Sequence, residues 1–207
     1  ASWSPLGRLP TGSWSADAVS LPQQNAAAGG TWVQLPRQHG ICSVPLRREP
    51  GLTSCAAEPR QAVVITSLGA GAWRVGNGLI ELDVSSAGLL ALRDRDGRNQ
   101  LSSPLQLERY RDRGEFWDAW DLAADYRSQP LGVLCTDSLE WLDQGPLVAH
   151  LVLRHKFGAS CMRLDLRLKA DTPWLELICS IDWRQTHELL RLELPLATPA
   201  VRIAADT

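Results

Sequence analysis

The second half of the chain alternates between apolar and polar residues with a period of two. Apolar residues occupy every second position in residues 162–168, 175–183 and 190–196, and mostly charged or polar residues lie between them. Successive side chains of a β-strand lie on opposite faces, so each segment is predicted to be a strand with one buried and one solvent-exposed face. Residues 147–156 form a further predicted strand.

The middle of the chain predicts shorter strands joined by tight turns. Residues 62–68 are rich in β-branched side chains, which strands favour. Asn77-Gly78 is a strong signal for a type I′ hairpin turn, and residues 80–84 alternate between apolar and acidic side chains after it. Further turns are predicted at residues 85–88 and 95–97. The segment is therefore predicted to be a β-meander.

These patterns together predict an all-β protein. Long half-buried strands joined by tight turns favour antiparallel sheets that pack face to face in a large β-sandwich. Residues 1–62 are interrupted by Pro, Gly and Ser, which favours short strands separated by loops. We divide the chain into a small N-terminal β-subdomain, residues 1–70, and a large antiparallel β-sandwich, residues 71–207. The last residues are strand-like without a stop signal, so we expect the sandwich to be truncated at its C-terminus.

Composition excludes several classes of function. The chain has 207 residues, with 21 Lys and Arg against 23 Asp and Glu, so no basic excess is present to bind nucleic acid. No apolar run approaches the roughly 18–20 residues that a membrane span needs. The five cysteines are scattered and form no CxxC pair, which argues against a disulfide framework. No secretory signal opens the chain. We therefore expect a reducing compartment, the cytoplasm.

One short segment carries an unusual combination of rings and carboxylates. Residues 114–126 read GEFWDAWDLAADY and place Trp117, Asp118, Trp120 and Asp121 within five positions. The C–H faces of a sugar ring stack on flat aromatic rings, while its hydroxyls need polar or charged partners in fixed positions. Trp beside Asp supplies both kinds of contact. The cluster is a candidate wall of a carbohydrate-binding cleft.

Two other interpretations of the cluster stay open. In the first, the tryptophans fill the end of the sandwich and the aspartates cap backbone amides or pair with nearby arginines, namely Arg111, Arg113 and Arg127. In the second, Asp118 and Asp121 bind a metal ion, although two carboxylates without a nearby His are weak evidence for such a site.

The histidines and the known catalytic motifs add no complete active site. His150 and His155 lie five residues apart on one predicted strand, so they lie on opposite faces and cannot chelate one ion. This also argues against a sugar epimerase, which would need two His and one Glu in one cleft. The chain contains no GxSxG, P-loop, GxGxxG or HExxH motif. We predict no catalytic residue and no metal ligand in this chain.

Four segments of the chain read SWSPLGRLP (2–10), VGNGLIELDVSSAGLLALRDRDGRNQL (75–101), FWDAWDLAADYRSQPL (116–131) and TPWLELICSIDWRQTHELLRLELPL (172–196). In this order they resemble the class II α-mannosidases, glycoside hydrolase family 38, in the bacterial and vacuolar branch. In the last segment the residues that match the family are Asp182, Trp183, His187, Leu189, Leu190 and Pro195. Arg184-Gln185 departs from the family, which usually has an acidic residue before the histidine.

The resemblance implies a fold and an enzyme. The fold would be the large galactose-mutarotase-like sandwich, or supersandwich. The parent would be a retaining α-mannosidase that uses two carboxyl groups and a zinc ion. Nucleophile and zinc ligands would lie in an upstream α/β-barrel, which a helical bundle links to this β-region, so the chain alone should be inactive.

In this resemblance the Trp–Asp cluster would contact a mannosidic oligosaccharide through Asp118, Trp120, Asp121 and Trp117. Trp183 and His187 would have structural roles. Two alternatives remain, a stand-alone carbohydrate-binding sandwich and a purely structural module.

Overall fold

The computed structural model describes residues 6–36, 43–49, 57–114 and 121–198. The described residues form antiparallel β-sheets, and their only helical element is the three-residue 3-10 turn η1 (Tyr126–Ser128). The all-β prediction is confirmed. No described helix is long and apolar enough to cross a bilayer.

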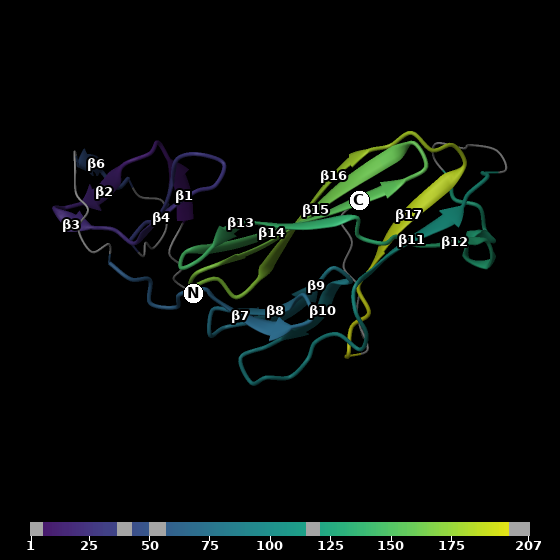
Figure 1. The fold of residues 1–207 in the computed structure, drawn as a ribbon, viewed down its shortest axis with the longest axis horizontal. Helices are drawn as coiled ribbons and strands as arrows, with labels where there is room; N and C mark the ends of the chain where they lie inside the picture. Colours follow the sequence, from purple (N-terminus) through teal and green to yellow (C-terminus); the bar gives the residue numbers. More distant parts are fainter. Residues whose placement is uncertain (1–5, 37–42, 50–56, 115–120, 199–207) are drawn as a thin grey trace.

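The N-terminal part contains two small sheets, shown at one end of the molecule in Figure 1. The first has the order β1-β5-β4 and the second the order β3-β2-β6. Their strands are β1 (Leu6–Leu9), β2 (Ser13–Ala16), β3 (Val19–Ser20), β4 (Gln23–Asn25), β5 (Thr31–Gln34) and β6 (Leu46–Glu49). Ala16, Leu21 and Val33 form a small apolar core of their own.

Two four-stranded sheets face each other in the sandwich (Figure 1). One has the order β10-β9-β8-β7 and the other the order β13-β14-β15-β16. Their strands are β7 (Val64–Gly69), β8 (Ala72–Gly76), β9 (Glu81–Ser85), β10 (Gly88–Arg93), β13 (Ser138–Gln144), β14 (Val148–Phe157), β15 (Ser160–Lys169) and β16 (Leu175–Asp182). Trp73 and Trp141 meet edge to face between the sheets, with ring centroids 5.9 Å apart. The two facing layers enclose the main apolar core.

A third sheet extends the sandwich and carries the segment with the predicted Trp–Asp cluster. It has the order β12-β11-β17, built from β11 (Gln106–Arg111), β12 (Pro130–Val133) and β17 (Glu188–Glu193). The connection from β11 to β12 contains the predicted cluster and η1.

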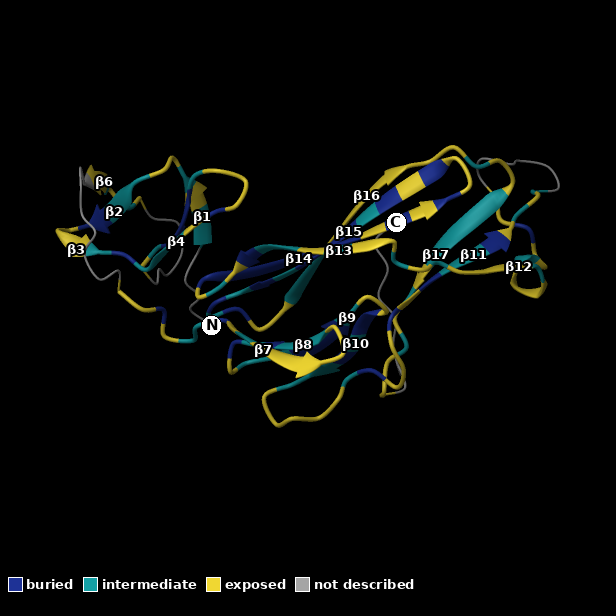
Figure 2. Cartoon of the chain, in the orientation of Figure 1, coloured by how far each residue is buried: buried dark blue, intermediate teal, exposed yellow. Residues whose placement is uncertain are grey.

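The predicted buried face of the last two strands is largely exposed. Leu175 and Leu177 are half-buried, but Ile181 is 46% exposed and Leu192 is 40% exposed. Figure 2 shows the exposed residues of β16 in yellow. The prediction of a buried face was wrong here, because no further layer of the described chain covers these side chains.

The predicted polar face of β15 is wrong in the opposite sense. Asp165 is only 3% exposed, and His150 beside it on β14 is 5% exposed. The N-terminal sheet covers part of this face, since Trp32 of β5 lies against Arg167 with 5.7 Å between the guanidinium carbon and the ring centroid. Trp32 therefore covers part of Arg167, which is half-buried. The Asp165 carboxylate is covered by His150 and Arg163, which both bond to it.

A glutamine fastens the N-terminal sheets to the sandwich. The side-chain oxygen of Gln24 accepts hydrogen bonds from the amides of Leu147 and Val148, each at 2.8 Å. Its side-chain nitrogen donates to the carbonyl of Val148 at 3.0 Å. The proposed division at residue 70 falls between β7 and β8, which pair in one sheet. The division into two units stays a prediction.

Candidate functional site

Most of the predicted Trp–Asp cluster lies outside the described residues. Trp117, Asp118 and Trp120 belong to this group, and Asp121 is the first described residue after them. Asp121 is exposed, and the ion pairs of the described residues join it to none of Arg111, Arg113 and Arg127. Its carboxylate is therefore available to solvent or to a ligand.

Both ends of the segment that carries the cluster are fixed to the third sheet. Asp112 follows β11, and its carboxylate accepts a hydrogen bond from the amide of Ala123 at 2.8 Å. The amide of Asp112 donates to the carbonyl of His187 at 2.9 Å, and the amide of Arg111 donates to the carbonyl of Gln129 at 2.9 Å. Residue 112 before the cluster and residues 123 and 129 after it are thus held in place at this end of the sheet.

Two tyrosines and an arginine support the second half of this segment. Tyr126 meets Tyr110 of β11 edge to face at 5.4 Å, and Arg191 of β17 lies over both rings at 5.6–5.8 Å. The Tyr126 hydroxyl accepts hydrogen bonds from Arg127 and Arg191, each at 3.2 Å. The hydrogen bond from Arg127 lowers the pKa of Tyr126 below its usual value, because it favours the phenolate. Arg127 is therefore engaged by Tyr126.

A comparison with known protein families covers this end of the sheet. The family model of the glycosyl hydrolases family 38 C-terminal domain matches residues 75–207, well over half of the chain. The chain belongs to this family. No curated protein matches the sequence. The match includes three of the four segments quoted above, and the segment at residues 2–10 lies before it.

The family 38 domain brings two of these segments together in space. The turn at His187, whose φ is +55°, leads into β17 and accepts the hydrogen bond from Asp112 at the base of the cluster segment. Glu188 then binds Arg109 of β11, with 2.6 Å between a guanidinium nitrogen and the carboxylate. Residues 111–112, 123–129 and 187–191 therefore share one end of the third sheet. Their proximity could not be inferred from either segment alone.

Trp183 contributes packing next to this end of the family 38 domain. The ring of Trp183 contacts the ring of Phe157, with centroids 5.7 Å apart. The guanidinium of Arg109 also lies over the Phe157 ring, 5.3 Å from its centroid. Trp183 is nevertheless 39% exposed. The side chain is thus only partly enclosed by the described residues.

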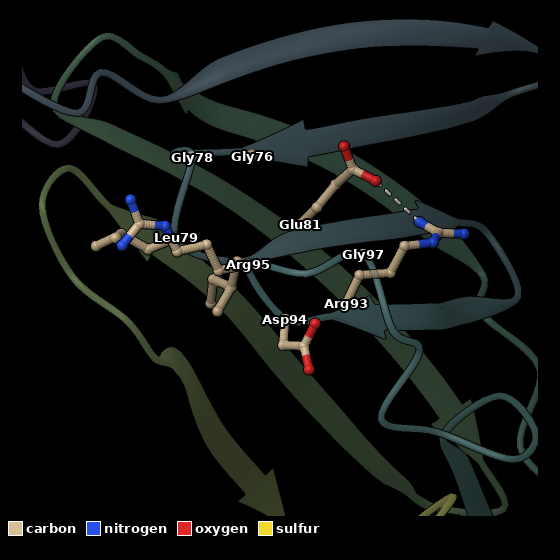
Figure 3. A pocket seen from close by; sticks show the side chains of 9 residues that line it. Gly76, Gly78, Leu79, Glu81, Arg93, Asp94, Arg95 and Gly97 are labelled. Atoms are coloured by element: carbon tan, nitrogen blue, oxygen red, sulfur yellow. Dashed lines mark hydrogen bonds and ion pairs between the residues drawn. The ribbon is translucent and has the colours of Figure 1, made fainter.

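A small hollow lies where the turn after β8 faces the turn after β10 (Figure 3). Its volume is about 180 Å³. Glu81 binds Arg93 at 3.2 Å, and Arg93 also binds Asp83 at 2.6 Å. Asp94 accepts hydrogen bonds from the amides of residues 96 and 98, both at 2.9 Å. Most charged groups around the hollow are thus engaged in holding the two turns.

The arginines next to this hollow strongly perturb Asp83. Asp83 is only 8% exposed, and Arg74 and Arg93 both donate hydrogen bonds to its carboxylate. The hydrogen bond from Arg74 is the largest influence, and together these donors lower the pKa of Asp83 from 3.8 to about 2, although burial opposes the shift. Sequence analysis missed this group because Asp83 and its two arginine partners lie on three different strands.

The two central histidines do not form a common site. His150 Nε2 lies 2.5 Å from a carboxylate oxygen of Asp165, and His150 Nδ1 lies 3.7 Å from Asp143. His155 lies on the opposite face of β14, where Nδ1 is 2.9 Å from the carbonyl of Cys135. Within the described residues no group of three or more His, Cys, Asp or Glu side chains is placed to hold a metal ion.

Proposed function

We propose that this family 38 domain is the C-terminal β-region of a zinc-dependent retaining α-mannosidase. In this proposal it lines a carbohydrate cleft that an upstream α/β-barrel of the same polypeptide completes. The observation that carries the proposal is the family match over residues 75–207. The anchored segment between β11 and β12 supports it, because the segment fixes a carboxylate-bearing loop at one end of the sandwich.

The contribution of this chain is binding and positioning. Asp121 has an exposed carboxylate that can accept hydrogen bonds from sugar hydroxyls. We assign Trp117, Asp118 and Trp120 to the same role, with the rings stacking on the C–H face of a mannosyl unit. Holding the sugar against a rigid sheet end restricts its orientation toward reactive groups supplied by the barrel.

Zinc and the reacting carboxylates belong to the upstream domain in this proposal. The described residues offer no three-ligand set that fits a zinc ion. In this proposal the contribution of this chain therefore does not involve zinc. The upstream domain would supply the metal, the nucleophile and the acid, and a helical bundle would connect it to this β-region.

The cysteines support the proposal of a cytoplasmic enzyme. Cys135, Cys161 and Cys179 are all free and exposed. Exposed free thiols are typical of proteins in a reducing compartment.

The test uses the complete polypeptide that contains this domain. It should release p-nitrophenol from p-nitrophenyl α-D-mannoside, lose that activity on treatment with 1,10-phenanthroline, and regain it when zinc is added. Absence of mannosidase activity, or activity that survives complete metal removal, would contradict the proposal.

A titration of the 207-residue chain with mannobiose, followed by tryptophan fluorescence, separates two alternative roles. Saturable change indicates a sugar-binding module that acts without the barrel. An unchanged emission spectrum, together with activity of the complete polypeptide, indicates that the sugar site forms only when both domains are present.

A further inference from the structure

A second and larger cavity lies between the sheets. Its volume is about 470 Å³, within the range of small-molecule binding sites. Leu105, Leu107, Leu153 and Leu164 form a buried apolar floor, and exposed residues of segments 86–88 and 133–136 form the rim. None of the described residues that line it is Asp, Glu, Lys or Arg. We call it the His155 cavity, after the one histidine in its lining.

His155 is one of three described residues with a buried side-chain atom that has no hydrogen-bond partner; the others are Arg167 and Asp171, which do not line this cavity. It is 3% exposed, and its Nδ1 lies 2.9 Å from the carbonyl oxygen of Cys135. A carbonyl oxygen can only accept a hydrogen bond, so Nδ1 must carry the proton. Nε2 of the neutral ring is then an acceptor, and this buried atom has no hydrogen-bond partner. Buried polar atoms normally have one.

The walls of the cavity are held in place before any ligand binds. The amide of Leu134 donates to the carbonyl of Leu107 at 2.8 Å, which ties the segment after β12 to β11. The amide of Asp137 donates to the carbonyl of Arg154 at 2.8 Å, and the Asp137 carboxylate accepts a hydrogen bond from the amide of Lys156 at 2.5 Å. His155 therefore lies between two backbone connections that fix its position.

From this combination we propose that the His155 cavity binds an uncharged, mostly apolar small molecule with one hydroxyl group, which donates a hydrogen bond to His155 Nε2. The leucine floor favours an apolar body, since burying it removes apolar surface from water. The missing charged groups disfavour an ionic ligand. A free sugar would leave most of its hydroxyls without partners against this floor. The proposal does not depend on the mannosidase assignment.

The site can be tested with two probes of almost the same shape. p-Cresol carries a hydroxyl where p-xylene carries a methyl group. The full chain is labelled with ¹⁵N-histidine, and each probe is titrated while long-range ¹H–¹⁵N correlation spectra report both nitrogens of each ring. His150 serves as the internal reference because its Nε2 already contacts Asp165.

We expect p-cresol to move the Nε2 resonance of His155 upfield in a saturable way, and to leave His150 unchanged. p-Xylene should bind roughly three- to ten-fold more weakly, the value of one neutral hydrogen bond. In a His155→Leu variant the preference for p-cresol should disappear or reverse, because its hydroxyl then has no acceptor in the cavity. That substitution removes the unpartnered atom, so it also reports whether the preference for the hydroxyl comes from Nε2.

A pair of rim variants checks the location. Val133→Trp places a large ring at the cavity mouth and should abolish p-cresol binding, since Val133 is 53% exposed and lines the cavity. Leu131→Trp is the matched control on the same strand, 38% exposed and outside the lining, and should bind p-cresol normally. Equal binding of both probes to the unmodified chain, a proton on Nε2 instead of Nδ1, or no saturable shift would each overturn the proposal. The last result would mean that water or another part of the polypeptide fills the cavity.

Discussion

The indole N–H of Trp32 donates a hydrogen bond to a carboxylate oxygen of Asp143, 3.2 Å away, and joins the N-terminal sheets to the sandwich. The other oxygen of Asp143 accepts a hydrogen bond from the amide of Ala27 at 2.9 Å. Asp143 is 5% exposed and Trp32 is 9% exposed. A buried charged acceptor therefore serves two donors from the N-terminal unit, which makes it a specific fastening between the two parts of the chain.

We predict that Asp143→Ala lowers the free energy of unfolding by about 2–4 kcal/mol, because it leaves two buried donors without an acceptor. Urea unfolding followed by tryptophan fluorescence measures the loss. Asp96→Ala is the matched control, since the side chain of Asp96 is 70% exposed and its contact with Arg98 is 3.7 Å long. The control should change the stability by no more than about 0.5 kcal/mol. Equal effects of both substitutions would refute the role given to Asp143.

The pH dependence of stability should carry a contribution from Asp83. Its folded-state pKa of about 2 lies below the ordinary value of 3.8. The ionised form is therefore stabilised in the folded state, and this contribution is complete above pH 3.8 and lost as the pH falls through about 2. The size of the shift corresponds to about 2 kcal/mol.

Unfolding free energies of the unmodified chain and of Asp83→Asn, measured from pH 7 to pH 2, test this contribution. We expect the unmodified chain to be more stable at pH 7 and the difference to shrink between about pH 4 and pH 2. Other carboxylates titrate equally in both proteins. Asp165 is one of them: burial raises its pKa, but the hydrogen bonds from Arg163 and His150 outweigh burial and lower it. A difference that stays constant over this range would show that Asp83 is not the titrating group.

The period-two pattern predicted the strands well, but predicted burial only where a second layer is present. Leu164, Leu166 and Leu168 are at most 3% exposed, as expected, because the opposite sheet covers them. Ile181 and Leu192 have the same pattern and are exposed. A strand's own sequence specifies which side chains share a face, but only its neighbours decide whether that face meets water.

The candidate sites were predictable to different degrees. The composition of the Trp–Asp segment was visible in the sequence, and the sugar-binding role of its residues stays a prediction. The His155 cavity could not be predicted, since its lining comes from strands and turns far apart along the chain. The sequence placed His155 on a strand, opposite His150, and the structure agrees. It contained no sign that one ring nitrogen would be buried without a partner.

The anchoring of the Trp–Asp segment leads to a prediction that rests on the proposed function. Asp112→Ala removes the acceptor for the amide of Ala123. In the complete polypeptide we expect kcat/KM for p-nitrophenyl α-D-mannoside to fall roughly tenfold or more, because a displaced contact no longer orients the sugar toward the reacting groups. The stability should fall by only about 1 kcal/mol.

Asp125→Ala is the control for this prediction. Asp125 is an exposed residue of the same segment, and among the described residues its carboxylate contacts only the side chain of Gln129, at 2.8 Å. Its kcat/KM should stay within about twofold of the unmodified value. If Asp112→Ala leaves kcat/KM unchanged, the segment between β11 and β12 does not position the sugar.

The turn at Asn77 shows how a local signal can be right about place and wrong about geometry. The chain does turn there, but only Gly78 has a positive φ, so the turn is not the predicted type I′, which needs positive φ at both central residues. Asn77 is 2% exposed, and its side-chain oxygen accepts hydrogen bonds from the amides of Leu79 and Ile80 at 3.0 and 3.1 Å. The tertiary fold, not the dipeptide, selects this conformation.

The same side chain connects the turn to the opposite sheet. Its nitrogen donates to the carbonyls of Lys169 and Thr172, each at 2.8 Å, at the turn between β15 and β16. We predict that Asn77→Ala lowers the free energy of unfolding by about 2–4 kcal/mol, because it leaves buried carbonyls and amides unpaired. Asn99→Ala is the comparison, since Asn99 also accepts two amide hydrogen bonds but is exposed, so water can replace it at a cost of about 1 kcal/mol or less. Urea unfolding of both variants measures the two losses of stability. A clearly larger loss for Asn77→Ala identifies Asn77 as a connection between the two layers. Comparable losses would mean that Asn77 acts only within its own turn.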